Sequence, residues 1–391
     1  MNILGVYVQV PFCASKCSFC NFSSRVERAS VFDSYSGALE NEIKDLPEAY
    51  AARSISRELL TLPVDTLYMG GGTPSLLGAR RLERIIRALQ ARFEFCPDLE
   101  FTLEVTPGSA DADFLAQARR WGLNRLSIGA QTFDDLELRA VGRLHRASET
   151  GELVKLARRQ GIQNISLDLI AGLPHQTKNS WRHTLEAAAR LEPQHISLYL
   201  FEIDEKSRLG RELLGQGTHY HASAVPGEAF VTDAYEDGRE FLEREGLTQY
   251  EISNFARPGF ESRHNQKYWR LDPYLGLGAG AHSFDGQRRW ANHTDPRAYS
   301  ETVARGTSPI DELRLLSARE QAEEFFFLGL RQRQGVNLSL AEQQWGTDQV
   351  ARLKERIAAL TAEGWLEQNG STLRLAERAY LVSNEVFQEF V

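Results

Sequence analysis

The stretch Pro11-Phe12-Cys13-Ala14-Ser15-Lys16-Cys17-Ser18-Phe19-Cys20 decides the fold. It follows a short apolar run, Ile3–Val10, that predicts a first strand. Its three cysteines have the spacing Cys-x3-Cys-x2-Cys, and thiolates are soft ligands that select iron–sulfur clusters, zinc or copper(I). Three thiolates on a four-iron cluster leave one iron open to another ligand. The spacing therefore predicts a [4Fe-4S] cluster on Cys13, Cys17 and Cys20.

A structural zinc site and three unrelated thiols are the alternatives to a cluster. Zinc needs a fourth ligand, which Cys96 or a histidine could supply. Cys96 lies between Phe95 and Pro97, where we expect ordinary packing. Four cysteines in 391 residues do not make a disulfide framework.

Beyond the cysteines, short apolar runs alternate with amphipathic stretches, and Gly or Pro ends most of the runs. The next predicted strands are Thr66–Met69, Glu100–Val105, Arg125–Ile128, Ile165–Ile170 and His195–Leu200. The predicted helices are Arg80–Phe93, Ala110–Trp121, Glu149–Gln160, Ser180–Leu191 and about Glu228–Glu245. This alternation predicts an α/β fold whose parallel strands form a barrel or part of one. In such folds the chemistry lies at the carboxyl ends of the strands.

The remaining chain changes character twice. Tyr250–Phe284 is rich in glycine and aromatic residues, and we expect an irregular segment packed on the barrel. Further on, helical patterns at Glu320–Leu330 and Gln349–Leu360 precede a hairpin signal around Gln368–Ser371. We therefore expect a barrel in residues 1–245, a connecting segment in 246–310 and a small winged-helix-like α+β domain in 311–391.

The formal net charge of −8 argues against attraction to nucleic acid, and residues 311–391 also carry more Asp and Glu than Lys and Arg. No stretch approaches the ~20 apolar residues of a membrane span. The first residues lack the pattern of a signal peptide. We expect a cytoplasmic protein, and peripheral contact with a membrane stays open.

Glycine and polar residues gather near the predicted strand ends. Gly70-Gly71-Gly72-Thr73-Pro74 follows the second strand, and three glycines let the backbone approach a ligand closely. Glu104 ends an otherwise apolar third strand, where a carboxylate is costly to bury without a partner. Gln131 and Asp168 lie at or near later strand ends. Each of these residues also has a structural alternative, as a turn, a hydrogen bond or a salt bridge.

The cysteine spacing after a first strand resembles the radical S-adenosylmethionine (SAM) signature. Tyr7-Val8-Gln9-Val10-Pro11-Phe12-Cys13 is similar to the branch that contains oxygen-independent coproporphyrinogen III oxidase. Within that branch the chain resembles most the HemW-type heme chaperones, over nearly its whole length and including the closing Leu381–Phe387. One departure is Gln9, where relatives usually have His.

The resemblance implies a partial (β/α)6 barrel, a cluster whose open iron binds SAM, and an electron donor that reduces the cluster. It implies residues that contact SAM, with Phe19 packing on the adenine. Matched one by one, these residues are Tyr7, Phe19, Gly71, Gly72, Thr73, Glu104, Gln131, Arg143 and Asp168.

The run His264-Asn265-Gln266-Lys267-Tyr268-Trp269 resembles a motif associated with heme binding in the chaperone branch. Imidazole is a common axial ligand of heme iron, although a lone histidine near aromatic residues is usually structural. The resemblance predicts heme as a cofactor and His264 as its ligand, with His282 as a second candidate.

Two differences separate the chain from the oxidases in its branch. Phe22 stands where they have a further cysteine, and the first strand begins almost at the amino terminus, where they have a longer segment. Both favour a heme chaperone that delivers heme to acceptor proteins, with respiratory proteins among the candidates. The alternative is a radical SAM tetrapyrrole enzyme such as oxygen-independent coproporphyrinogen III dehydrogenase. We expect that activity to be absent, and cleavage of SAM stays open.

Overall fold

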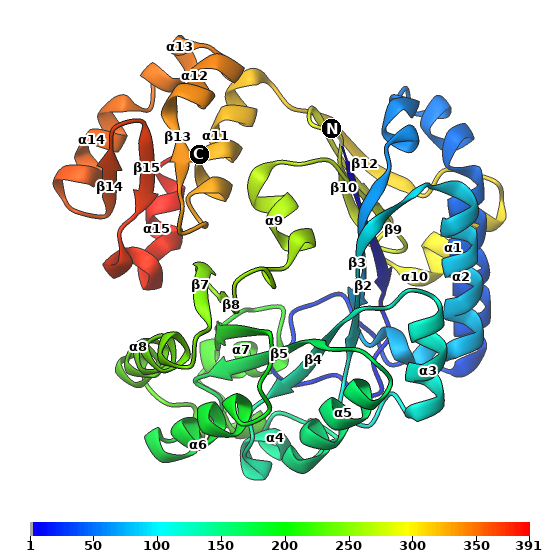
Figure 1. The fold of residues 1–391 in the computed structure, drawn as a ribbon, viewed down its shortest axis with the longest axis horizontal. Helices are drawn as coiled ribbons and strands as arrows, with labels where there is room; N and C mark the ends of the chain where they lie inside the picture. Colours follow the sequence, from blue (N-terminus) through cyan, green and yellow to red (C-terminus); the bar gives the residue numbers. More distant parts are fainter. Residues whose placement is uncertain (1–2) are drawn as a thin grey trace.

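The computed structural model describes residues 3–391, and six parallel strands that alternate with helices form its centre (Figure 1). The strands are β1 (Leu4–Val10), β2 (Val64–Gly71), β3 (Phe95–Val105), β4 (Arg125–Gln131), β5 (Asn164–Ala171) and β6 (His195–Leu200). The helices are α1 (Ala29–Ala52), α2 (Ala79–Arg92), α3 (Ala112–Arg120), α4 (Asp135–Ala140), α5 (Ala147–Arg159), α6 (Lys178–Ala189), α7 (Arg208–Leu214) and α8 (Glu228–Arg244). The predicted parallel α/β fold is confirmed.

Side chains alternate between the two faces of these strands, as a pleated strand requires. On β1 the side chains of Leu4, Val6, Val8 and Val10 are fully buried in the main hydrophobic core. The intervening Tyr7 is only partly buried and stacks on Tyr68 of β2, with ring centroids 5.9 Å apart. The strands therefore contribute aliphatic residues to the core and polar or aromatic residues to the interior of the barrel.

Further strands extend the sheet on both sides, and the barrel does not close. The order is β12-β11-β10-β9-β1-β2-β3-β4-β5-β6-β8-β7, so that β1 and β6 are not paired with each other. The added strands are β7 (Thr248–Glu251), β8 (Asn254–Ala256), β9 (Tyr274–Leu277), β10 (His282–Phe284), β11 (Arg288–Asn292) and β12 (Ile310–Leu315). Helix α10 (Pro296–Ala304) connects the last two.

The segment Tyr250–Phe284 is more regular than we expected from its composition. It contains β8, β9, β10 and the helix α9 (Arg263–Arg270). The three strands have only three or four residues each, which is too short to show a sequence period. β8 and β9 pair with the distant strands β6 and β1, and β10 joins the sheet through its neighbours β9 and β11. This one sheet contains strands from both sides of residues 245 and 310, the boundaries of the three predicted parts. Our division into three parts stays a prediction.

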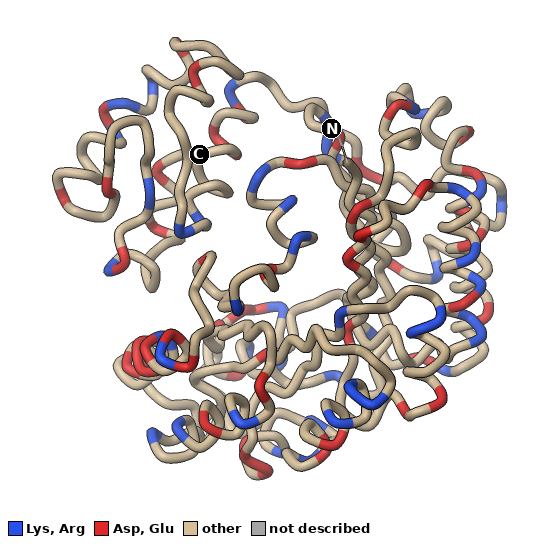
Figure 2. The backbone as a smooth tube through the Cα atoms, in the orientation of Figure 1, with Lys and Arg blue, Asp and Glu red and all other residues tan. Residues whose placement is uncertain are grey.

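Helix α9 enters the interior of the barrel (Figure 1), and Figure 2 shows its basic residues near the centre of the molecule. The Nζ atom of Lys267 lies 2.7 Å from Oδ1 of Asp65, and both side chains are buried. Arg263 reaches the other oxygen of Asp65, at 3.1 Å. The backbone N–H groups of Arg263 and His264 donate to the carboxylate of Glu100 on β3. Two carboxylates from β2 and β3 therefore hold the first turn of α9.

The chain after β12 folds as a helical body with a small antiparallel sheet, β13-β15-β14. Its elements are α11 (Ala318–Gly329), β13 (Val336–Asn337), α12 (Leu338–Trp345), α13 (Thr347–Ala351), α14 (Lys354–Ala362), β14 (Leu366–Asn369), β15 (Thr372–Leu375) and α15 (Ser383–Gln388). The hairpin turns at Gly370, whose φ of +58° suits a residue without Cβ. The prediction of a single helix over Gln349–Leu360 is wrong, because the helix is interrupted at Arg352–Leu353, between α13 and α14.

Replacing Asp65 by Ala should strongly destabilise the fold. Lys267 is 3% exposed, and removing Asp65 leaves its buried ammonium without its direct ion-pair partner, at a cost of about 3–5 kcal/mol. We expect this loss in the free energy of unfolding, measured by chemical denaturation. Asp233→Ala is the matched control, since its ion pair with Lys178 is exposed and should contribute little to stability. Equal stabilities of the two variants would contradict the anchoring role of Asp65.

Candidate functional site

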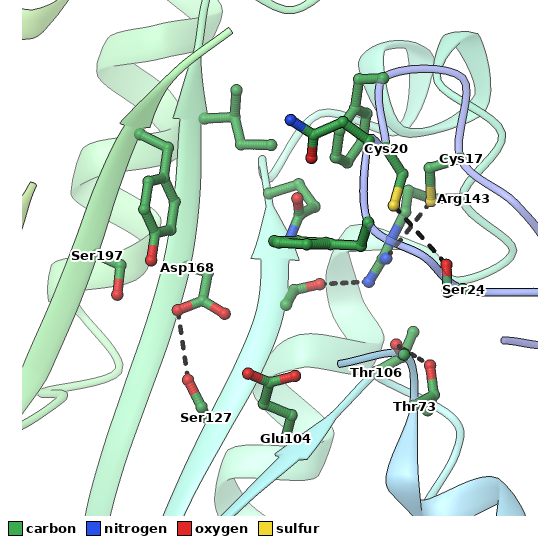
Figure 3. A pocket seen from close by; sticks show the side chains of 18 of the residues that line it. Cys17, Cys20, Ser24, Thr73, Glu104, Thr106, Ser127, Arg143, Asp168 and Ser197 are labelled. Atoms are coloured by element: carbon green, nitrogen blue, oxygen red, sulfur yellow. Dashed lines mark hydrogen bonds between the residues drawn. The ribbon is translucent and has the colours of Figure 1, made fainter. Parts of the chain in front are cut away.

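A cavity of about 800 Å³ opens at the carboxyl ends of the parallel strands. This volume lies within the ~300–1,000 Å³ range of small-molecule sites. The three cysteines of the loop after β1 lie on its wall. Figure 3 shows two of them, Cys17 and Cys20, together with polar residues from β3, β4 and β5. Of the predicted site residues, those that line it are Cys13, Cys17, Cys20, Phe19, Gly71, Gly72, Thr73, Glu104, Gln131, Arg143 and Asp168.

Backbone hydrogen bonds fix the cysteine loop against its neighbours. The N–H of Thr73, after β2, donates to the Phe12 carbonyl over 2.7 Å, and the N–H of Cys13 donates to the Arg25 carbonyl over 2.9 Å. On the other side, Ser18 donates to the carbonyl of Val141 and accepts from the N–H of Leu209 in α7. Because the backbone is held at these points, the three thiols face one cavity.

The glycine run after β2 is required by this packing. A Cβ at Gly72 would lie 2.4 Å from the carbonyl oxygen of Phe12, and one at Gly70 would lie 2.8 Å from the carboxylate of Glu104. Gly71 has a φ of +104°, which favours glycine. The run therefore lets the end of β2 approach both the cysteine loop and a buried carboxylate.

Glu104 and Asp168 point into the cavity from nearby strands (Figure 3). Glu104 accepts hydrogen bonds from the Tyr68 hydroxyl at 2.9 Å and from the Gly71 N–H at 3.0 Å. Burial, and then the charge of Asp168, raises the pKa of Glu104 to about 7. Asp168 accepts from the Ser127 hydroxyl at 3.3 Å, and burial raises its pKa to about 6. This pair of carboxylates suits a ligand that carries positive charge.

Arg125 is a residue of this site that our sequence reasoning missed. Its side chain is 1% exposed, lines the cavity, and makes one long hydrogen bond, to the Thr102 hydroxyl at 3.5 Å. Its charge lowers the pKa of both Glu104 and Asp168, against the effect of burial. The signal that pointed to Glu104, a charged residue in an apolar strand, was also present at Arg125.

Arg143 and Gln131 complete the wall near the cysteines. The Nη1 atom of Arg143 lies 3.7 Å from Sγ of Cys17, and its Nη2 group donates to the Gly129 carbonyl. Gln131, the last residue of β4, has a φ of +68°, a strained conformation for a residue with a side chain. Such strain is common at ligand sites, and Gln131 lines the cavity.

Two predicted site residues, Tyr7 and His264, are not among those that line the cavity. Tyr7 donates its hydroxyl proton to Oε1 of Gln9 over 2.7 Å. His264 is 1% exposed, with Nδ1 2.8 Å from the Thr66 hydroxyl and Nε2 2.9 Å from the Tyr268 hydroxyl. Burial, and then the charge of Lys267, lowers the pKa of His264 to about 3. Both ring nitrogens are thus engaged within the barrel, and a heme iron reaches Nε2 only if Tyr268 moves away.

The other candidate ligands lie elsewhere. Cys96 is at the beginning of β3, where the neighbouring Phe95 pairs with Val64 at the start of β2, so it lies at the opposite end of the strands from the cysteine loop. It therefore does not supply a fourth ligand at the cysteine loop. His282 begins β10 and is exposed.

Comparison with known proteins agrees with this geometry. Residues 7–188 match the family model of the radical SAM superfamily, and residues 316–382 match that of the HemN C-terminal domain. The heme chaperone HemW of Bacillus subtilis is 32% identical over 388 residues, which are 99% of both chains. The chain belongs to the HemW family of radical SAM proteins.

Other relatives of this HemW-family chain point the same way. The heme chaperone HemW of a Synechocystis species is 35% identical over 94% of this chain and 87% of its own. Coproporphyrinogen III oxidase (HemN) from Escherichia coli, a radical SAM enzyme of known structure, superposes with a TM-score of 0.85. It is 26% identical, and the match covers all of this chain and 90% of that one.

A radical SAM domain implies a [4Fe-4S] cluster and SAM, and the residues of this cavity fit both groups. Three thiols face one space, glycines allow close approach, and buried carboxylates complement the cationic groups of SAM. When bound, the cluster supplies the electron that cleaves SAM in this superfamily. The chain itself positions the two groups and shields them from water.

Changing Cys13, Cys17 and Cys20 together to Ala should abolish cluster assembly. We expect the brown chromophore, iron and acid-labile sulfide to be absent after anaerobic reconstitution, because no thiolates remain at the loop. Cys96→Ala is the matched control and should assemble a full cluster. A triple variant that still holds four irons would show that the ligands lie elsewhere.

The affinity for SAM should depend on pH through Glu104. With a pKa of about 7, its carboxyl gains a proton between pH 8 and pH 6 and loses its attraction for the cationic groups of SAM. We expect SAM to bind about tenfold more weakly at pH 6 than at pH 8, by equilibrium dialysis with the cluster in place. The stability of the SAM-free protein should change in the opposite sense, because ionising a buried carboxyl with a raised pKa destabilises the fold.

Glu104→Gln tests the assignment, since it keeps the size of the side chain and removes its charge. The variant should bind SAM weakly at both pH values and lose most of the pH dependence. Wild-type affinity in this variant would remove Glu104 from the site.

Proposed function

We propose that this chain is a heme chaperone that binds heme and delivers it to acceptor proteins. The observation that carries the proposal is similarity along the whole length to proteins named heme chaperone HemW, 32% over 99% of both chains for that of Bacillus subtilis. The cavity adds a space for ligands beside the cysteine loop. Respiratory heme proteins are candidate acceptors. A further protein would reduce the cluster.

In this proposal the [4Fe-4S] cluster is bound by Cys13, Cys17 and Cys20. SAM lies across the carboxyl ends of β2 to β5, against Glu104 and Asp168, while Arg143 faces it from the loop before α5. Phe19, between two cluster ligands, packs on the adenine. Tyr7 supports the site from behind, through its stacking on Tyr68. We place the protein in the cytoplasm; within residues 3–391 no helix is long and apolar enough to span a bilayer.

His264 is the proposed heme ligand, and the structure sets a condition on that role. Nε2 must exchange the Tyr268 hydroxyl for iron, and α9 must open toward the cavity. The neutral imidazole that burial enforces is the form that ligates iron. Asn265 of the same helix already lines the cavity, so that one face of the motif is accessible.

A tetrapyrrole enzyme remains the second candidate, because the superposition on Escherichia coli HemN is close. Phe22 argues against the same reaction. It occupies the position of the oxidases' additional cysteine, lines the cavity and is 66% exposed.

Heme titration of the purified protein tests the proposal. We expect a shifted Soret band with one equivalent of heme, and no conversion of coproporphyrinogen III to protoporphyrinogen IX with reduced cluster and SAM. His264→Ala should change the Soret band or weaken binding. Tyr268→Phe, which frees Nε2 and keeps the ring, should bind heme at least as well as the wild type.

The outcomes separate the candidates. Absence of heme binding by the wild type would overturn the chaperone, and turnover of coproporphyrinogen would establish the enzyme. Identical heme spectra of the wild type and His264→Ala would place the ligand elsewhere, with His282 or a cysteine next.

A further inference from the structure

The cavity has a second set of polar residues, separate from the predicted cluster and SAM residues. They come from α9 and from the carboxyl-terminal part of the chain, on elements that the cysteine loop does not contact through its backbone hydrogen bonds. The members used below are Asn265, Arg331 and Asn384. None of them belongs to the residues that we assign to SAM.

Arg331 is the only cation in this set, and its hydrogen-bonding capacity is unfilled. A guanidinium has five N–H donors in a planar fork. The buried Nε of Arg331 has no hydrogen-bond partner among residues 3–391. The carboxylate of Glu251 lies 3.7 Å from its Nη2, within the range of an ion pair but beyond a hydrogen bond. The two Nη groups make no hydrogen bond among residues 3–391 and are available to a ligand, whereas the buried Nε is not accessible.

The surroundings hold Arg331 in place. Its guanidinium carbon lies 4.5 Å from the centre of the Trp269 ring, a cation–π contact from the last turn of α9. The backbone carbonyl of Arg331 accepts a hydrogen bond from the N–H of Ile252. Two residues further on, the N–H of Arg333 donates to the carbonyl of Tyr250. The guanidinium is thus fixed between α9 and the turn that joins β7 to β8. A fixed donor group loses little entropy when it binds a ligand.

The motif His264–Trp269 acquires a structural explanation from this arrangement. His264 and Lys267 are buried and attach α9 to β2. Asn265 faces the cavity, and Trp269 supports the guanidinium that also faces it. The motif therefore forms one end of the cavity, and most of its side chains support the wall without lining it.

We propose that this end of the cavity binds a propionate carboxylate of the tetrapyrrole, with Arg331 as its main donor and Asn265 and Asn384 beside it. The proposal rests on the proposed function, and it assigns which edge of the ligand faces this end of the cavity: the propionate edge lies toward Arg331 and the carboxyl-terminal body. Arginine matches a carboxylate through two parallel hydrogen bonds, which are stronger in an enclosed site than in water. Glu251 orients the guanidinium and offsets part of its charge, so that recognition depends on directed hydrogen bonds.

The experiment compares heme, heme dimethyl ester and metal-free protoporphyrin IX as ligands of the full-length protein. The ester has the same ring and iron but no free carboxylate, and protoporphyrin IX has the carboxylates without iron. Arg331→Met should lower the affinity for heme and for protoporphyrin IX by about 10- to 100-fold, the usual range for hydrogen bonds to charged groups. The affinity for the ester should stay within about twofold of the wild-type value. Arg331→Lys should recover part of the affinity, because it restores charge without the fork.

Two further variants test whether the effect is specific to this end of the cavity. Arg333→Met is the matched control, since that arginine is two residues away, pairs with Glu243 and Glu377 at the surface and does not line the cavity. It should bind all three ligands as the wild type does. Asn384→Asp, at an exposed position of α15 where folding is not threatened, places a carboxylate beside the ligand and should weaken heme more than the ester.

The results distinguish this inference from the proposed function. If the wild type binds neither heme nor its ester, the chaperone itself fails. If the wild type binds heme and ester equally, or Arg331→Met weakens both to the same extent, heme binding stands and the carboxylate site is overturned. Loss of the preference for heme over ester in Arg331→Met and Asn384→Asp, with Arg333→Met unchanged, supports it.

Discussion

The contact between the cysteine loop and the glycine end of β2 is the constraint on which the rest of the site depends. Two N–H groups at that end donate to the chain of the first strand and its loop, from Gly72 to Val10 and from Thr73 to Phe12. A side chain at Gly72 would occupy the space of the Phe12 carbonyl. Without that approach the thiols would not face the carboxyl ends of β3 to β5, where the buried carboxylates lie.

Charge is distributed unevenly inside the barrel, so that different parts of the cavity favour ligands of opposite charge. Glu104 and Asp168 lie on its floor with Arg125 near them, and burial raises both carboxyl pKa values toward neutrality. Such a site favours a cationic ligand and loses its charge under mildly acidic conditions. Arg331, on a different part of the wall, has the opposite preference. One cavity thus offers distinct positions to a sulfonium cofactor and to a carboxylate.

Helix α9 links these two regions to the stability of the fold. Asp65 and Glu100 hold its first turn, while His264 stacks near Tyr7 and Tyr68 under the floor of the cavity. Any movement of α9 that exposes His264 must first break this buried polar network. The cost of leaving such groups unpaired is large, so the proposed ligation of heme by His264 requires a ligand whose binding offsets it.

The sequence by itself determined the cysteine site and the parallel α/β fold, because ligand spacing and hydrophobic period are local properties of the chain. It also located Glu104 and Asp168 at or near strand ends. Tertiary structure decided what local patterns do not contain: the short strands at the sheet edges, the entry of α9, the burial of His264, and Arg331 in the cavity wall. These depend on pairing between residues far apart in sequence, since three-residue strands have no period and a histidine shows its burial only when its neighbours are in place.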